Sequence, residues 1–212
     1  EPSDADEGEA ERVAEAVKRL GLRHAVITSV TRDDLPDGGA RIFADTVRQI
    51  RWNCPGTTVE LLIPDLQGDR KALETILESS PDVLGHNLET VRSLQWIRDR
   101  RASYRRSLNV LATVREISPA AITKSSLMLG LGEGRDEVLE AFRDLLEVGV
   151  DLLTLGQYLP PKGSSLPLRR YVPPEEFQEL ERTARGMGFR GVRSGPLVRS
   201  SYDAYALFKE VM

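Results

Sequence analysis

The sequence has one cysteine in 212 residues, Cys54, and this scarcity sets the firmest limit on its chemistry. A disulfide within the chain needs two cysteines, and a thiolate-held zinc or iron–sulfur centre needs several. The chain as printed therefore cannot build such a centre from its own residues. Long apolar runs are also missing, since stretches such as 25–27 and 61–63 are strand-sized and far too short to span a membrane. We expect no membrane-embedded segment.

The start of the chain has no initiator methionine, no basic segment and no apolar targeting segment. Its first eleven residues include no basic side chain and six acidic ones, Glu1, Asp4, Asp6, Glu7, Glu9 and Glu11. From this pattern we expect the chain to be a fragment cut at Glu1. The whole chain is 40% apolar and 29% charged with a net charge of −4, which predicts one soluble domain or slightly more.

Apolar periodicity alternates between strand and helix patterns along the chain. Short runs rich in β-branched residues predict strands at 24–29, 58–63, 83–87, 121–128 and 152–155. Helical spacing of apolar residues predicts helices at 10–20, 40–51, 70–78, 90–100, 104–117, 136–147 and 175–185. Strands separated by helices of these lengths pair in parallel through right-handed crossovers, so we predict an α/β fold.

Polar residues follow successive predicted strands at their carboxyl ends, at 28–29, 87–89, 124–125 and 156–157. In a parallel barrel these ends converge on one mouth. This placement favours a partial parallel β/α barrel of the TIM type over a doubly wound sheet. The proline-rich stretch 158–174 is incompatible with regular structure and predicts a long loop.

Three local features could carry chemistry, and each also has an ordinary structural interpretation. The loop at 32–39 holds one guanidinium and three carboxylates, which either line a site or form an acidic turn that caps a helix. The glycine-rich segment 130–134 can bring backbone amides close to a ligand, but it lacks the lysine of a phosphate-binding loop. Lys124 follows a strand and can be an anion ligand, a Schiff-base amine or a solvated strand-end lysine.

The histidines and the arginines have plainer interpretations. His24 and His86 lie on predicted strands without the spacing of a metal-binding pair, so we interpret both as structural. Five arginines form a basic run, which are Arg98, Arg100, Arg101, Arg105 and Arg106. Because the chain is net acidic and only Tyr104 is interleaved with this run, we interpret it as a solvated corner between helices and expect no nucleic-acid partner.

Six motifs occur in order over nearly the whole chain. They are ITSVTRDDL with DGG at 27–39, NLETV at 87–91, TKS with LM at 123–128, GLGE at 130–133, LGQYL at 155–159 and GPLVRSSY at 195–202. Each motif alone is weak, but their conjunction resembles lipoyl synthase, a family of radical S-adenosylmethionine enzymes. The resemblance implies an incomplete barrel at 1–194, lacking its first strand and cluster loops, and a C-terminal RSSY tail at 195–212.

The same resemblance implies the reaction, the cofactors and the partners. One 4Fe–4S cluster would reduce S-adenosylmethionine to a 5′-deoxyadenosyl radical, and a second would be consumed as sulfur donor. The radical would take hydrogens from C6 and C8 of an octanoyl chain on a carrier-protein lysine, where sulfur is inserted. Expected partners are an octanoylated 2-oxoacid dehydrogenase domain or glycine cleavage H protein, an electron donor and an iron–sulfur carrier. The expected location is the cytoplasm, or the mitochondrion or plastid in a eukaryote.

The resemblance also implies site residues, which are the positions of this sequence that match the family's motifs. The candidates for binding S-adenosylmethionine are Thr28, Ser29, Asn87, Glu89, Glu133 and Gln157. The candidates for facing the reacting chain or ordering the mouth are Lys124, Arg32, Asp33 and Asp34. By the same resemblance, Ser200 or Ser201 would give an oxygen ligand to the sulfur-donating cluster, a weak ligand that suits an iron that must leave.

The departures from the family pattern leave two other functions open. The family's cysteine triplets are not in this sequence, and we expect them just upstream of Glu1, so that the chain alone is inactive. Cys54 lies on no motif and is interpreted as structural. One alternative is a clusterless relative that binds S-adenosylmethionine or an octanoylated domain without chemistry. Another is a different barrel enzyme, such as an aldolase with Lys124 as its Schiff-base amine.

Overall fold

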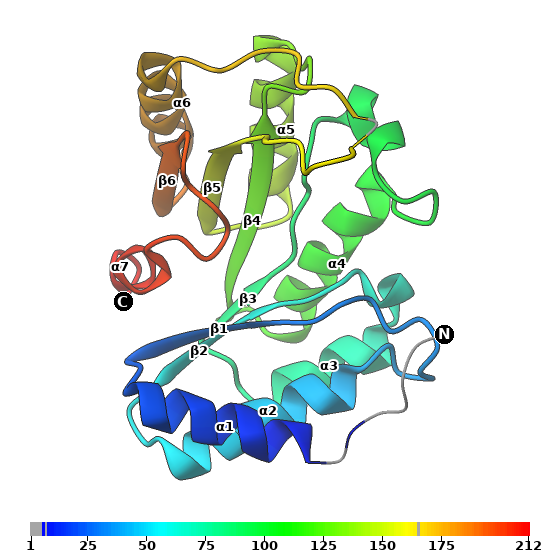
Figure 1. Cartoon of the computed structure of the whole chain (residues 1–212), viewed down its shortest axis with the longest axis vertical. Coiled ribbons are helices and arrows are strands. Elements are labelled where there is room, and N and C mark those ends of the chain that lie inside the picture. The colour runs from blue at the N-terminus through cyan, green and yellow to red at the C-terminus, as the bar shows by residue number, and fades with distance from the viewer. Residues whose placement is uncertain (1–5, 7, 165) are drawn as a thin grey trace.

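A computed structural model describes residues 6, 8–164 and 166–212 of the chain, so that Glu1, the expected cut, lies outside the described residues. Within these ranges six parallel strands form one sheet in the order β1-β2-β3-β4-β5-β6. They are β1 (His24–Thr28), β2 (Thr58–Leu62), β3 (Val83–Gly85), β4 (Ile122–Leu129), β5 (Leu152–Gln157) and β6 (Gly191–Gly195). The sheet curves strongly, with β4 to β6 upright and β1 and β2 nearly horizontal in Figure 1. The predicted α/β fold with a partial parallel barrel is confirmed.

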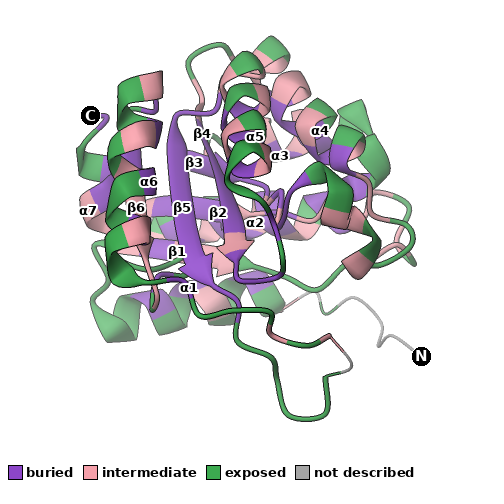
Figure 2. Ribbon diagram, turned by 90° about the horizontal axis from the view of Figure 1, so that it is seen from above, coloured by how far each residue is buried: buried purple, intermediate pink, exposed green. Residues whose placement is uncertain are grey.

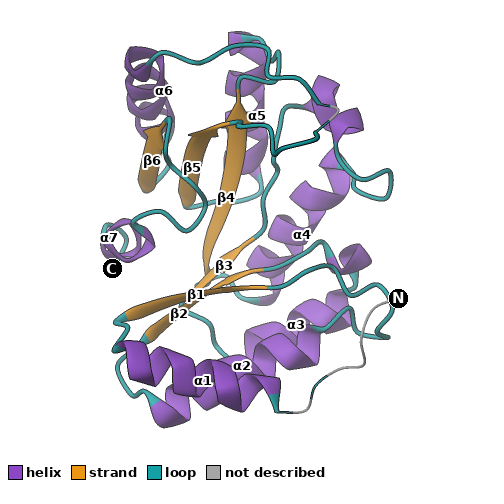
Figure 3. Cartoon of the chain, in the orientation of Figure 1, coloured by secondary structure: helices purple, strands orange, loops and turns teal. Residues whose placement is uncertain are grey.

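Helices alternate with the strands, and α1 to α6 cover the outer face of the curved sheet (Figure 3). They are α1 (Glu9–Leu20), α2 (Ala40–Asn53), α3 (Arg70–Glu78), α4 (Tyr104–Ile117), α5 (Arg135–Glu147), α6 (Pro174–Met187) and α7 (Ala204–Lys209), with 3-10 turns η1 (Leu66–Gly68) and η2 (Arg92–Ile97). The ends follow local signals: Gly21, at φ 60°, ends α1 in the left-handed conformation, and the Asp69 side chain accepts the Lys71 amide at the start of α3. Among the described residues, no helix has the length and apolar character to span a bilayer.

Apolar clusters join the helices to the sheet. One cluster packs α1, α2 and α3 against β1 to β3, with Val17, Phe43 and Leu73 among its members. Another packs α5 and α6 against β4 to β6 through Phe142 and Phe177. Figure 2 shows the strands buried in the centre and the helices buried only on the side that faces them. The helices are therefore held by one apolar stripe each, as amphipathic helices are.

The inner, concave face of the sheet carries an apolar cluster under α7, which includes Val83 and Leu152, and polar side chains beyond it. On β1, Ala25 and Ile27 belong to the outer apolar cluster, so the alternation of strand side chains turns His24 and Thr28 inward. The same alternation places Glu60 of β2 on the inner face, where it contacts Lys124 of β4. The inner face therefore combines an apolar floor with a small number of polar side chains, as ligand sites do.

Strand β6 and helix α7 were not predicted from the sequence, and one predicted helix is shorter in the structure than predicted. Strand β6 holds two glycines and Arg193 in five residues, so that it shows no apolar alternation, and it is defined by its pairing with β5. Helix α7 has six residues, too few for a helical period to be recognised. The segment predicted as helix 90–100 forms only the 3-10 turn η2 at Arg92–Ile97.

The segment 196–203 that joins β6 to α7 crosses the sheet at Gly156. A Cβ at Gly156 would lie 2.2 Å from the Val198 carbonyl oxygen, so the crossing requires glycine at this position. Helix α7 then packs against β1, where the Phe208 ring stacks on His24 with centroids 5.6 Å apart. Helix α7 contacts both β1 and β6, the two strands that border the open side of the sheet. The domain boundary at 194 stays a prediction.

Candidate active site

A pocket of about 780 Å³ opens at the carboxyl ends of β1, β2 and β3. It collects charged and polar side chains from loops that are far apart in the sequence. Five of the predicted site residues line it, which are Thr28, Ser29, Asp33, Asn87 and Glu89. Its other charged and titratable lining residues are Asp65, His86, Arg98, Asp99, Arg100, Arg101 and Arg106.

A bulge after β3 places Asn87 and Glu89 in this pocket. The Glu89 amide donates to the Ser126 carbonyl and its own carbonyl accepts from the Met128 amide, so that Glu89 rejoins the sheet while 86–88 bulges. Glu89 has a positive φ of 69°, and Asn87 Nδ2 donates to its Oε1 at 3.1 Å. Burial raises the pKa of Glu89, although the Asn87 hydrogen bond and the nearby charge of Arg98 oppose the rise.

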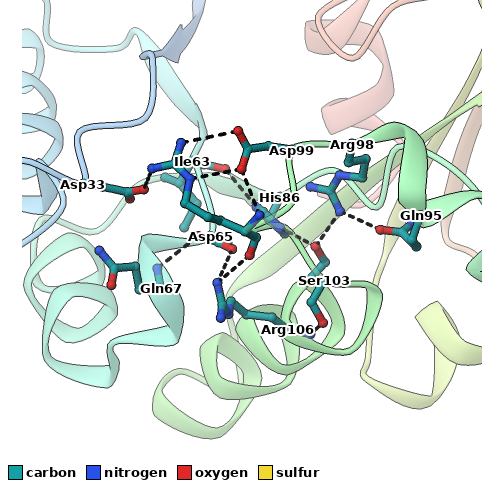
Figure 4. A network of polar contacts seen from close by, with 12 residues as sticks. Asp33, Ile63, Asp65, Gln67, His86, Gln95, Arg98, Asp99, Ser103 and Arg106 are labelled. Carbon is teal, nitrogen blue, oxygen red and sulfur yellow. Dashed lines mark hydrogen bonds and ion pairs between the residues drawn. The ribbon is translucent and has the colours of Figure 1, made fainter. Parts of the chain in front are cut away.

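A chain of hydrogen bonds fixes Arg98 at the pocket, and Figure 4 shows several of its members. Arg98 Nη1 donates to Ser107 Oγ at 3.1 Å, and Ser107 Oγ lies 2.9 Å from His86 Nε2. His86 Nδ1 lies 2.9 Å from the Ile63 carbonyl, which can only accept. Burial lowers the pKa of His86, so the ring is neutral, Nδ1 carries the proton and Nε2 accepts from the Ser107 hydroxyl. This agrees with the structural role predicted for His86.

Arg98 itself is a half-buried cation without a matching ion pair. Its guanidinium donates to Gln95 Oε1 at 3.1 Å and to Ser107, and no ion pair joins it to a carboxylate among the described residues. Burial lowers the pKa of Arg98, while the charges of Glu89 and Asp65 act in the opposite direction. Arg98 and Glu89 are therefore a partly buried cation and a partly buried carboxylate of the pocket that form no ion pair among the described residues.

The predicted loop 32–39 divides between the pocket and the outer surface. Asp33 lines the pocket and pairs with Arg101 at 2.6 Å, whereas Arg32 pairs with Asp34 at 2.7 Å and neither lines the pocket. The hydrogen bond from Arg32 lowers the pKa of Asp34. Of the basic run, Arg98, Arg100, Arg101 and Arg106 line the pocket. The interpretation as a solvated corner agrees with the exposed Arg100, Arg101 and Arg105, but not with the half-buried Arg98. A run of arginines carries no sequence signal that separates Arg98 from solvated positions.

The prediction that Lys124 follows a strand is wrong, because Lys124 is the third residue of β4; it lies deeper, on the inner face, and does not line the pocket. Its Nζ is 2.7 Å from Glu60 Oε1, and the two side chains are 3% and 2% exposed. The other Glu60 oxygen lies 3.5 Å from His24 Nε2, without a hydrogen bond. An amine enclosed in this ion pair is not presented to a carbonyl substrate, so the structure gives no support to the Schiff-base alternative.

Two predicted cofactor-binding residues are used by the fold itself. The Glu133 carboxylate accepts from the backbone amides of 130, 131 and 132 and closes the glycine-rich turn. Gln157 Oε1 accepts from the Val172 amide at 2.8 Å, and its Nε2 donates to the carbonyls of Leu129, Tyr158 and Arg170. Neither side chain lines the pocket, and the polar atoms of both are hydrogen-bonded to the backbone.

The predicted metal ligands lie in the crossing segment between β6 and α7. Ser200 is half-buried and Ser201 is exposed, and neither lines the pocket. Among the described residues, no group of three or more histidine, cysteine, aspartate or glutamate side chains is placed to hold a metal. Cys54 is buried, with its Sγ 3.7 Å from the Ala14 carbonyl of α1, which fits its structural interpretation.

Comparison with known proteins identifies the family. The profile of the radical SAM superfamily matches residues 2–145, and the chain belongs to this superfamily. The structure also resembles that of HydG, a maturase of the [FeFe]-hydrogenase, with a TM-score of 0.72 and 12% identity over 99% of this chain and 48% of that one. This second likeness shows the shared fold.

The closer relatives narrow the family further. The chain is 56% identical over 206 residues to the lipoyl synthase of Thermus thermophilus, covering 97% of this chain and 64% of that protein. It is 55% identical to the lipoyl synthase of Pyrobaculum arsenaticum, covering 96% of this chain and 70% of that protein. Within the superfamily the chain therefore belongs to the lipoyl synthase family, and membership implies S-adenosylmethionine and iron–sulfur chemistry. The chain spans 64% of the length of the Thermus relative.

Replacing Lys124 with Met should lower the free energy of unfolding by about 3–5 kcal/mol, because the Glu60 carboxylate then stays buried without its cation. The double replacement Glu60→Leu and Lys124→Met should cost less than the single one, since the apolar pair needs no partner. Urea unfolding followed by circular dichroism measures both. The exposed Lys18→Met on α1 is the control and should change stability by less than about 0.5 kcal/mol. A Lys124→Met protein as stable as the parent would contradict the ion pair's role.

The raised pKa of Glu89 predicts an unusual pH dependence of stability. Between the ordinary value of 4.5 and the raised value, the folded chain binds more protons at Glu89 than the unfolded chain does, so this residue's contribution falls as pH rises. Glu89→Gln should therefore gain stability relative to the parent between about pH 4 and about pH 7. Glu137→Gln is the opposite control, because hydrogen bonds from Ser93 and the Gly134 amide lower the pKa of Glu137. Urea unfolding at both pH values measures the differences, and equal signs for the two variants would refute the argument.

Proposed function

We propose that this chain forms the barrel part of a lipoyl synthase, which inserts sulfur at C6 and C8 of an octanoyl chain on a carrier-protein lysine. The proposal rests on the family membership described above. The observation that carries it is the meeting of two family motifs at one pocket, through Asp33 of the first motif and Asn87 and Glu89 of the second. Polar groups from distant loops converge there as a ligand site requires.

The pocket residues fit S-adenosylmethionine. This cofactor carries an ammonium group, a carboxylate and ribose hydroxyls, and the pocket volume of about 780 Å³ lies in the range of small-molecule sites. Glu89 and Asn87 can accept from the ammonium or the hydroxyls, Arg98 can bind the carboxylate, and Thr28 and Ser29 add hydroxyls. When bound and reduced at a cluster, S-adenosylmethionine supplies the hydrogen-abstracting chemistry of the superfamily.

The chain's own residues would bind and orient this cofactor. The hydrogen-bond chain through Ser107 and neutral His86 holds the Arg98 guanidinium in one orientation, which lowers the cost of ordering it when a carboxylate binds. The Glu89 carboxylate is desolvated before binding, so a bound ammonium group offsets the cost that raises its pKa. Both effects favour a zwitterionic ligand over a neutral one of similar size.

The residues of this chain do not fit an iron–sulfur cluster. Cys54 is its only cysteine and is buried against α1, and no other donor set is present among the described residues. We place the cysteine ligands of the family's two 4Fe–4S clusters in the part of the relatives that this chain does not cover. Ser200 or Ser201 would contribute one oxygen ligand, and the half-buried Ser200 is the more sheltered of the two.

The proposed partners follow from the reaction. They are an octanoylated domain of a 2-oxoacid dehydrogenase or glycine cleavage H protein, an electron donor and a carrier that restores the consumed cluster. The clusterless alternative is tested by the reading frame that encodes the chain, because cysteine triplets upstream of Glu1 would exclude it.

The test uses the longer protein encoded by that reading frame, reconstituted with iron and sulfide without oxygen. With S-adenosylmethionine, a reductant and an octanoylated carrier domain, we expect 5′-deoxyadenosine and lipoyl-lysine by mass spectrometry. Ser200→Ala or Ser201→Ala should keep 5′-deoxyadenosine formation and lose most lipoyl product, whereas Ser118→Ala, in the turn after α4, should keep both. Absence of iron uptake would contradict the proposed function. Unchanged lipoyl formation in both tail variants would contradict only the serine ligand.

A further inference from the structure

The segment 98–106 forms one rim of the pocket, and its paired arginines hold it in place. Arg98 is bound to Gln95 and Ser107, as described above. Arg101 pairs with Asp33 at 2.6 Å and with Asp99 at 3.0 Å, and Arg106 pairs with Asp65 at 3.2 Å. These contacts join the rim to the loops after β1 and β2, so its backbone is a fixed support for the remaining side chains.

Two arginines of this rim have no partner among the described residues. Arg100 and Arg105 are exposed, and no hydrogen bond, ion pair or ring contact involves either guanidinium in the described part of the chain. Arg100 lines the pocket, while Arg105 lines a neighbouring hollow of about 500 Å³ between η1 and α4. The hollow shares Gln67 and Arg106 with the pocket, so uncompensated positive charge extends from the pocket onto the outer surface.

We propose that Arg100 and Arg105 dock an acidic surface of the carrier domain whose octanoyl-lysine enters the pocket. This inference rests on the proposed function, because it concerns the substrate of the same site. A lysine arm on a folded domain brings the surface around that lysine to the rim of the pocket. The chain has a net charge of −4, so an acidic domain is repelled by the molecule as a whole and attracted to this rim. Such complementarity mainly raises the association rate and fixes the orientation of docking.

The rim suits protein carboxylates better than a nucleic acid. Single-stranded nucleic acids bind basic surfaces that also offer aromatic rings for base stacking. The aromatic residue within this run, Tyr104, is 6% exposed, and its hydroxyl donates to Asp144 at 2.7 Å. Its ring is covered on one face by Arg92. Stacking on this ring is therefore blocked, and the free guanidinium groups provide the contacts.

The binding test uses the reconstituted longer protein and a fluorescently labelled, octanoylated 2-oxoacid dehydrogenase domain of net negative charge. Fluorescence anisotropy at low and moderate salt gives the dissociation constant. The double variant Arg100→Glu and Arg105→Glu should bind about tenfold more weakly or worse, with a flatter salt dependence. The control, Arg19→Glu and Arg143→Glu, changes the net charge equally at exposed positions of α1 and α5 and should bind within about twofold of the parent.

A turnover test separates docking from chemistry. Arg105→Glu should raise KM for the acidic domain but leave turnover of an uncharged octanoyl-lysyl tripeptide unchanged. Equal weakening in the rim and control variants, unchanged binding in the rim variant, or tighter binding of single-stranded RNA than of the domain would overturn the docking surface. No lipoyl product from either substrate, with rim-dependent binding intact, would instead overturn the proposed function and leave the docking surface standing.

Discussion

The buried ion pair between Lys124 and Glu60 is the interaction on which the inner architecture depends. Strand β3 lies between the two strands that carry it and has only three residues, so it provides few ladder bonds of its own. Gly85 is the β3 residue beside Lys124 and has no side chain to separate the partners. The pair ties β2 to β4 across this short strand, in the region where the sheet bends most (Figure 1). Two charges removed from water this completely are stable only when they contact each other. The pair therefore favours the bend of the sheet that brings Glu60 and Lys124 together.

The pocket at the strand ends uses charge differently. Inside the barrel, Lys124 and Glu60 neutralise one another in an ion pair. At the mouth, Arg98 and Glu89 are partly desolvated and form no ion pair with each other. The Ser107–His86 chain orients Arg98, and the bulge after β3 orients Glu89. A ligand with both an ammonium and a carboxylate would complete these charges, which is the physical basis of the proposed S-adenosylmethionine site.

Much of this fold was predictable from the sequence because burial on one face imposes a period on the apolar residues. Strand β6 was not, because two glycines, Arg193 and Ser194 leave Val192 as its one apolar side chain, and pairing with β5 defines it. The motifs indicated Asp33, Asn87 and Glu89, which line the pocket, yet they do not specify side-chain direction. Gln157 is two residues after Leu155 on β5, so both side chains lie on the outer face of the sheet. The alternation along this strand could therefore have shown that Gln157 turns away from the inner face.

The proposed S-adenosylmethionine pocket is formed by residues of this chain, so the chain should bind this molecule without a cluster. Equilibrium dialysis of the chain as printed against labelled S-adenosylmethionine, up to millimolar concentration, tests it most directly. Glu89→Gln and Arg98→Leu are the pocket variants, and Glu147→Gln, at the far end of α5, is the control. We expect saturable binding to the parent and the control, with at least fivefold weaker binding to each pocket variant, on the order of 1 kcal/mol. Absence of saturable binding, or equal binding by all four proteins, would contradict it.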